Sequence, residues 1–254
     1  MSFDLDNTVF NQALIFIEDA VISLGGKALD EYGLPKPDRR KASTPIEIIR
    51  ETSYDVRELA EFVAENEPKM LDDQKAAYSR IIDSVEKNRG CLFFLDSPGG
   101  TGKSFVINLL LAAVRQNKRI ALAVVSSGIA ATVLSGGRTA HSVFKLPLNL
   151  SLAETPTCNI SKGTALAEVM SQCSLIVWDE CTMSHKAAFE ALDKTLQDIR
   201  GNKCLMGGVT FTMAGDFRQT LPVVSRGTRA DEMQACVKSS YLWRHFTKLS
   251  SILT

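Results

Sequence analysis

The 254-residue sequence predicts an α/β protein, a parallel sheet flanked by helices and preceded by a small helical N-terminal segment. From about residue 70 onward, short apolar runs alternate with longer stretches of helical periodicity, the pattern of strands joined by crossover helices. Before that point, apolar residues recur only at helical spacing. The composition, with 45% hydrophobic and 23% charged residues, is typical of a soluble globular protein.

The first 69 residues are expected to form a helical segment followed by a linker. Residues 9–32 carry apolar side chains at near-helical spacing, which predicts a helix or a helix pair broken at the glycine pair 25–26. Two prolines then indicate a linker, because proline disrupts regular structure. Residues 44–66 predict a second helical stretch. We therefore place a domain boundary near residue 69, with one larger domain over 70–254.

The predicted elements of the larger domain alternate between helix and strand. The run CLFFLD is continuously apolar, as expected of a strand buried on both faces. The predicted order is a helix at 71–88, a strand at 91–96, a helix at 103–116, a strand at 119–126, a helix at 128–136, an irregular loop at 147–162, a strand at 174–179, a helix at 184–201 and a strand at 209–216.

Charge and composition narrow the class of partner. Residues 1–69 hold 8 Lys and Arg against 14 Asp and Glu, and the remainder holds 21 against 15. A mildly basic domain behind an acidic segment suits a polyanionic partner. The six scattered cysteines form no C-x-x-C pair and are expected to be free thiols. No apolar run reaches the roughly 20 residues that span a bilayer. The acidic N-terminus also lacks the basic flank of a signal peptide, so we expect a cytosolic or nuclear protein.

The stretch DSPGGTGKSF, residues 96–105, has the form of a phosphate-binding loop. It follows a buried strand and opens a helix, where backbone N–H groups converge and favour negative charge. Lys103 is expected to reach the β- and γ-phosphates of ATP, and the Ser104 hydroxyl to ligate Mg²⁺. Ser97 replaces the usual first glycine, and its small side chain is expected to leave the loop intact. The alternative, a glycine-rich turn with a solvated lysine, fits this setting less well. The expected nucleotide-binding residues of the loop are Gly99, Gly100, Thr101, Gly102, Lys103 and Ser104.

Two further polar motifs end apolar strands. In LIVWDE, Asp179 is expected to hold Mg²⁺ and Glu180 to polarise the attacking water. In GDFRQ, Gln219 is expected to bond the γ-phosphate or that water. Read alone, the two acids could cap a helix and GDFRQ could be a solvated loop. Their combination with Lys103 favours catalysis, with Lys103, Glu180 and Gln219 as the catalytic set.

The motifs SPGGTGKSF, SSGIAATVLSGGRTAHSVFKLP, LIVWDECTM and GDFRQTLPVV together resemble those of superfamily-one DNA helicases, most closely the PIF-type family and the helicase halves of Helitron transposon proteins. The resemblance covers residues 70–254 and implies the first RecA-like P-loop NTPase domain of such a helicase. The segment ALIFIEDAVISLGGKALDEYGLPKP also resembles the region before the helicase core in transposon-type members. The implied activity is ATP-dependent 5′–3′ DNA unwinding.

The resemblance also implies residue roles that spacing alone does not. Gln74 matches the glutamine that reads adenine, and residues 126–130 match the motif that grips single-stranded DNA. For two candidates there are alternatives: His141 could be a buried, hydrogen-bonded histidine and Phe144 could be plain core packing. The expected contacts with single-stranded DNA are Ser127, Gly128, Thr139, His141 and Phe144.

The stretch YLWRHFTKLSSILT resembles the last helix and strand of the first RecA-like domain, and the second RecA-like domain of such helicases has no counterpart in this sequence. We therefore expect a fragment or a truncated copy. We also expect it to act as a monomer on single-stranded DNA and to have a nuclear location. One rival is a small-molecule kinase built on the same loop, which the GDFRQ motif disfavours. The other is a non-unwinding, ATP- and DNA-binding remnant of a transposon-encoded helicase.

Overall fold

The computed structural model describes residues 3–23, 25–38, 46–96, 98–147, 150, 156–219, 222–224 and 227–250. In these residues the α-helices are α1 (Phe3–Ser23), α2 (Ile46–Thr52), α3 (Val56–Asn66), α4 (Asp72–Glu86), α5 (Lys103–Gln116), α6 (Ala140–Phe144), α7 (Ala165–Gln172), α8 (Lys186–Ile199) and α9 (Arg229–Ala235). The strands are β1 (Leu92–Asp96), β2 (Ile120–Val125), β3 (Arg138–Thr139), β4 (Cys173–Asp179), β5 (Thr210–Gly215) and β6 (Phe246–Ser250). Short 3₁₀ turns include η3 (Ala130–Thr132) and η5 (Cys181–Met183).

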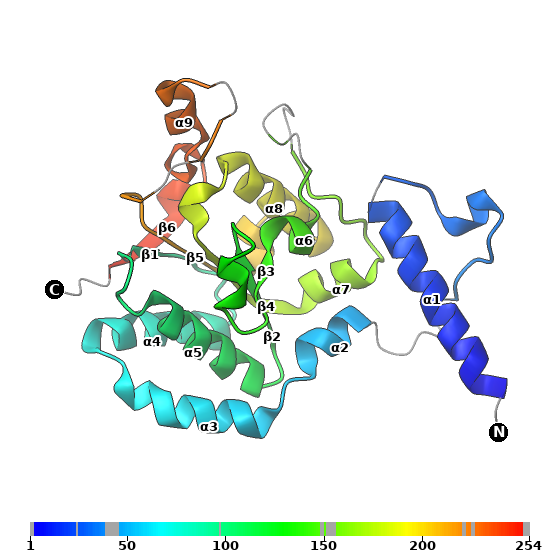
Figure 1. The fold of residues 1–254 in the computed structure, drawn as a ribbon, viewed down its shortest axis with the longest axis horizontal. Coiled ribbons are helices and arrows are strands. Elements are labelled where there is room, and N and C mark those ends of the chain that lie inside the picture. The colour runs from blue at the N-terminus through cyan, green and yellow to red at the C-terminus, as the bar shows by residue number, and fades with distance from the viewer. Residues whose placement is uncertain are drawn as a thin grey trace.

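The strands of the described residues form one parallel sheet in the order β3-β2-β4-β5-β1-β6 (Figure 1). This confirms the predicted parallel α/β architecture. The order places β1 beside β5, and β4 between β2 and β5. Because all strands run the same way, the loops that follow β1, β2, β4 and β5 leave the sheet at one edge, where ligands collect in such folds.

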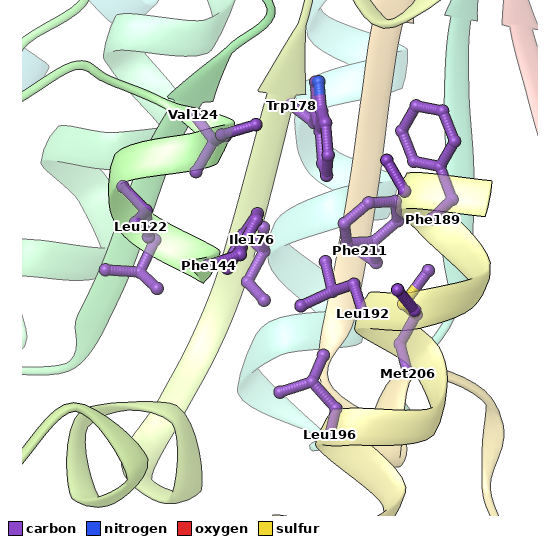
Figure 2. Close-up of a cluster of buried hydrophobic side chains, with 14 of the residues drawn as sticks. Leu122, Val124, Phe144, Ile176, Trp178, Phe189, Leu192, Leu196, Met206 and Phe211 are labelled. Atoms are coloured by element: carbon purple, nitrogen blue, oxygen red, sulfur yellow. The ribbon is translucent and has the colours of Figure 1, made fainter. Parts of the chain in front are cut away.

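Each central strand buries both of its faces. Phe93 and Leu95 of β1 belong to the apolar layer beneath α3, α4 and α5, whereas Leu92 and Phe94 belong to the layer beneath α6, α7 and α8. This is the period-two alternation of a strand. Figure 2 shows the second layer, in which the Trp178 ring lies 4.5 Å from that of Phe189 and 5.5 Å from that of Phe144 between ring centroids.

The N-terminal residues pack onto this sheet domain at several places, and in α1 the Asp19 carboxylate accepts from the Ala165 N–H of α7 at 3.1 Å. α2 lies against α7 and the β2 end of the sheet, where the buried Glu51 pairs with Arg138 of β3. Next along the chain, the Tyr54 ring lies under the guanidinium of Arg115, 4.3 Å from ring centroid to Cζ. α3 then runs along α5 and buries Val63. The boundary near residue 69 stays a prediction, and linker residues 39–45 lie outside the described residues.

The predicted helix over residues 128–136 is wrong. The structure has only the single turn η3 there, followed by tight turns that lead into β3. The chain folds back so closely that a Cβ on Gly137 would stand 2.4 Å from the Ala131 carbonyl oxygen. A continuous helix cannot make this reversal, and the glycines of the segment permit it.

Several short elements were not predicted, namely β3, α6, α7 and α9. They are too short for a periodic pattern to stand out. The predicted irregular loop at 147–162 falls partly on residues 148–149 and 151–155, which lie outside the described residues. Its described end, 156–162, has no helix or strand. All six cysteines are free, and no helix in the described parts of the chain is long and apolar enough to cross a membrane.

Candidate functional site

The phosphate-binding loop lies between β1 and α5, as its sequence predicts. Gly100 and Gly102 have φ values of +79° and +78°, in the left-handed region that other residues rarely adopt. The Thr101 hydroxyl donates to the Pro98 carbonyl at 2.8 Å and closes the turn. α5 then begins at Lys103, so the loop presents the N-terminal backbone N–H groups of a 14-residue helix. Ser97 lies outside the described residues, so its effect on the loop stays a prediction.

Lys103 lies between the two acids at the end of β4, Asp179 and Glu180. Its Nζ is 2.9 Å from Asp179 Oδ1 and 3.2 Å from Glu180 Oε1, and all three side chains are largely buried. Burial by itself would lower the pKa of Lys103, but the charges and hydrogen bonds of the two carboxylates outweigh it and leave that pKa raised. Burial raises the pKa of Asp179, and the ammonium beside it acts in the opposite direction. The predicted phosphate-binding lysine and the predicted metal-binding acid therefore meet, although they are far apart in sequence.

The local backbone explains how Asp179 and Glu180 reach one lysine. In a strand, successive side chains point to opposite faces, so adjacent acids would normally diverge. Here Asp179 ends β4 and Glu180 leaves the strand in the left-handed region, at φ 52° and ψ 35°. The Glu180 N–H donates to Asp179 Oδ1 at 2.8 Å, which fixes the turn. Both carboxylates consequently face Lys103.

The GDFRQ loop after β5 reaches the same place. β5 pairs with β1, with Gly215 opposite Asp96, so the loops that follow the two strands are neighbours. Gln219 lies against the phosphate loop, since a Cβ on Gly99 would stand 3.0 Å from Gln219 Nε2. That amide donates to Asp216 Oδ2 at 3.3 Å, and Arg218 Nε lies 2.9 Å from Asp216 Oδ1. The buried Asp216 thus anchors Gln219 beside the loop.

Gln74 touches the phosphate loop from another side. It lies in the first turn of α4 and is 5% exposed. Its Nε2 donates to the Thr101 carbonyl at 3.1 Å, and its Oε1 accepts from the Leu71 N–H at 3.2 Å. Both ends of the amide are therefore engaged with backbone in this structure. The amide links α4 to the loop, and the adenine-reading role implied by the resemblance stays a prediction.

The residues expected to contact DNA gather at the β2 and β3 end of the same sheet edge. Gly128 and His141 are exposed, and the Ser127 hydroxyl lies 3.4 Å from the Ala130 N–H. The Thr139 hydroxyl accepts from the Ser142 N–H at 3.4 Å and caps α6. Phe144 differs, because it is fully buried against Trp178 and offers no ring face to a base. Its position fits the packing alternative, and the exposure of His141 argues against the buried alternative for that residue.

Sequence reasoning missed two features of this edge. Ser126, assigned only to the start of the DNA-gripping motif, points inward and makes three side-chain hydrogen bonds. Arg138, inside GGRTAHSVF, pairs with Glu51 of the N-terminal segment. Neither had a signal in the sequence, because their partners lie 52 to 87 positions away.

Comparison with known proteins fits this geometry. The sequence profile of the PIF1-like helicase family matches residues 69–253. The chain is 29% identical over 149 residues to the ATP-dependent DNA helicase Pif1 of Psychrobacter sp. (59% of this chain, 22% of the relative). It is 27% identical over 182 residues to that of Mus musculus (70% and 25%). The chain thus spans about a quarter of the length of these relatives.

Solved structures show the same fold. Pif1 helicase from Bacteroides in complex with ADP-AlF3 and single-stranded DNA superposes with a TM-score of 0.57 at 20% identity, covering 70% of this chain and 42% of that one. Pif1 helicase from Candida albicans gives 0.53 at 20% identity, covering 72% and 40%. With a phosphate loop, two acids and a glutamine on one sheet edge, and with the family profile spanning most of its length, this chain belongs to the PIF1-like helicase family.

Proposed function

We propose that this chain is the part of an ATP-dependent 5′–3′ DNA helicase that binds MgATP and one face of single-stranded DNA. The observation that carries the proposal is the convergence of Lys103, Asp179, Glu180 and Gln219 on the loop that opens α5. Relatives in the family are named ATP-dependent DNA helicases, and one structural neighbour is a complex with a nucleotide analogue and single-stranded DNA.

The residues present fit a magnesium–nucleotide complex. Mg²⁺ prefers hard oxygen ligands and takes one or two from the protein and the rest from phosphates and water. Ser104, in the first turn of α5, and Asp179 supply a hydroxyl and a carboxylate of this kind. When bound, the ion would neutralise charge on the phosphates. The Lys103 ammonium, which is paired with the two carboxylates in this structure, would then pair with the phosphates of the nucleoside triphosphate.

Glu180 and Gln219 are the side chains proposed to act on the attacking water and the γ-phosphate. Once Lys103 turns to phosphate, the Glu180 carboxylate is free to accept a proton from an attacking water. Gln219 rests on Gly99, so a γ-phosphate bound there would meet its amide. The roles proposed are therefore phosphate binding for Lys103, general base for Glu180 and γ-phosphate sensing for Gln219.

The proposed DNA contacts are Ser127, Gly128, Thr139 and His141, without the buried Phe144. They lie on the domain whose residues 70–254 carry six more basic than acidic side chains, with 21 against 15. We propose a monomer on single-stranded DNA. We also propose a nuclear location and a role in repair, recombination or telomere maintenance, on the ground of the resemblance to PIF-type helicases; one of the matching relatives is from Mus musculus.

The test is titration with a fluorescent ATP or ADP analogue in the presence of Mg²⁺. We expect the wild-type chain to bind and Lys103→Ala to lose most of the affinity, because Lys103 is the only cationic side chain among the described loop residues 98–104. Lys75→Ala, an exposed lysine of α4, is the matched control and should bind as the wild type does. Equal binding by wild type and Lys103→Ala, both measured well below their unfolding temperatures, would remove the basis for a nucleotide site.

A further inference from the structure

Ser126 stands at the junction between the proposed nucleotide site and the proposed DNA loop. β2 and β4 are paired, with Val125 opposite Asp179. Ser126 and Glu180, the residues that follow these two strands, also lie next to each other. The Ser126 N–H donates to the Asp179 carbonyl at 3.3 Å. Ser126 also opens the loop 126–130, in which Gly128 is exposed and Ile129 is 88% exposed. One residue thus belongs to both sites.

The Ser126 hydroxyl uses its full hydrogen-bonding capacity inside the protein. A serine hydroxyl has one donor and two acceptor positions. The Ser126 Oγ donates to the Glu180 carbonyl at 2.7 Å and accepts from Trp178 Nε1 at 3.1 Å. The remaining position is taken by Ser184 Oγ at 2.8 Å. Since the fully buried Trp178 has only this partner for its indole N–H among the described residues, the hydroxyl cannot turn away without cost.

The carbonyl that Ser126 holds belongs to a residue in an unfavourable conformation. Glu180 has a positive φ although it is not glycine, and such residues persist only where their surroundings fix them. Its N–H donates to Asp179 Oδ1, and its carbonyl accepts both from the Ser126 hydroxyl and from the Met183 N–H at 3.1 Å. This conformation directs the Glu180 carboxylate to Lys103. Loss of the Ser126 hydroxyl would remove one of these three hydrogen bonds, and the one of them that comes from the 126–130 loop.

We propose that Ser126 is a positioning residue that holds Glu180 in its working conformation and transmits displacement of the 126–130 loop by single-stranded DNA to it. The proposal rests on the proposed function, because it needs Glu180 as the acid and the loop as a DNA contact. A shift of the loop moves Ser126, and with it the Glu180 carbonyl and the Trp178 indole. DNA binding would in this way alter the geometry of ATP hydrolysis without contacting the nucleotide.

The first arm of the test is single-turnover ATP hydrolysis with protein in excess, which detects slow rates. We expect Ser126→Ala to lower the rate roughly tenfold, equivalent to about 1.4 kcal/mol, while MgATP affinity stays within roughly threefold. Ser126→Thr keeps the hydroxyl and should restore the rate. Ser171→Ala, which removes an exposed hydroxyl on α7, is the matched control and should be unchanged. The positioning role would be overturned if Ser126→Ala hydrolysed ATP at the wild-type rate, or if the Ala and Thr variants lost the same amount of rate. It would also be overturned if the wild type bound MgATP without hydrolysing it.

The second arm reads the transmission directly from Trp178. The chain has two tryptophans, so a Trp243→Phe background leaves Trp178 as the only tryptophan, and its emission is read under excitation selective for tryptophan. We expect saturating oligothymidylate to change the emission of Trp178, and the change to be lost in Ser126→Ala and kept in Ser126→Thr. Binding is measured separately from the anisotropy of a label on the DNA. Binding with unchanged emission would overturn the transmission alone, whereas no binding by any variant would refute the proposed DNA site and the transmission with it.

The variants must be folded for either arm to count. Near-ultraviolet circular dichroism and thermal unfolding check each one. Ser184→Ala gives a second route if Ser126→Ala does not fold, because it leaves the Ser126 hydroxyl in place and removes one of its three partners. An intermediate loss of hydrolysis is expected there, and a wild-type rate with a wild-type Trp178 response would count against the proposal.

Discussion

Replacing Lys103 with alanine should destabilise the protein even with no nucleotide present. In the wild type the Lys103 ammonium lies 2.9 Å from the Asp179 carboxylate, whose side chain is 7% exposed, and 3.2 Å from that of Glu180. The variant leaves two adjacent carboxylates facing each other without a counter-charge. A buried charge that has lost its partner is strongly unfavourable, because neither water nor protein compensates it.

The magnitude follows from two opposing effects. Breaking a buried ion pair by removing one partner costs about 3–5 kcal/mol. Glu180 keeps a 29% exposed side chain, so the low end of that range applies. Removing a cation from the first turn of α5 returns about 0.3–1 kcal/mol through the helix dipole. The net loss in the free energy of unfolding is about 2–3 kcal/mol, which lowers Tm by roughly 5 °C in a chain of this length.

The assay is thermal unfolding followed by circular dichroism, at neutral and mildly acidic pH. The pKa of Asp179 is already raised by burial and should rise further without the ammonium, so the folded variant binds a proton more tightly than the unfolded chain does. The deficit against wild type should therefore shrink as pH falls through that raised pKa. Lys103→Ala combined with Asp179→Asn should recover much of the loss at neutral pH, because the amide needs no counter-charge. Lys75→Ala is again the control and should unfold at the wild-type temperature. The reasoning would be refuted if Lys103→Ala were as stable as the wild type, or if the double variant were no more stable than Lys103→Ala.

Three further outcomes are expected. Single-stranded DNA should bind weakly and lose affinity steeply as salt rises, because phosphate contacts release counterions; a salt-independent affinity in filter binding, or a preference for blunt duplex, would argue against a helicase-type surface. A polypeptide of residues 1–254 alone should not unwind a 5′-tailed duplex and should turn over ATP very slowly, because the resemblance implies that arginines at the γ-phosphate come from a second domain outside these residues. Such arginines contribute on the order of 10³–10⁵ in rate in related phosphoryl-transfer enzymes; robust unwinding that Glu180→Gln abolishes would contradict this. Phe144→Ala should lower the free energy of unfolding by about 3–5 kcal/mol, because it leaves a cavity in the core. His141→Ala should instead weaken DNA binding with little loss of stability. The reverse pattern would restore Phe144 as a DNA contact.

Local patterns in the sequence are sufficient to locate most strands and long helices of the sheet domain. The runs at 91–96, 119–126, 174–179 and 209–216 each correspond to a strand within two residues of the predicted bounds. They are legible because strands of a parallel sheet are buried on both faces and must be apolar throughout. The failure at 128–136 has the same origin, since apolar residues in a row indicate burial but not whether the chain continues as a helix or reverses.

In the candidate site, too, the sequence predicts the features that depend on consecutive residues and does not predict those that depend on spatial neighbours. The phosphate loop could be predicted because its function depends on consecutive residues, with glycines that permit the turn and a lysine and hydroxyl that open the helix. The family resemblance follows from four such motifs in order. Gln74 and Phe144 show the limit, because their assigned roles depend on which neighbours surround them, and the structure places one against the loop backbone and the other in the core.

By itself, then, the sequence determined the kinds of element, the chemistry of each motif and the family of the chain, because these depend on residues close together along the backbone. Only the tertiary structure decided which motifs meet. The strand order brings the loops after β1, β4 and β5 together and sets Lys103 between Asp179 and Glu180. It also turns the Ser126 hydroxyl inward to the Glu180 carbonyl. The physical reason is that strand pairing joins segments tens of residues apart through backbone hydrogen bonds, which leave no mark on the identity of any single residue.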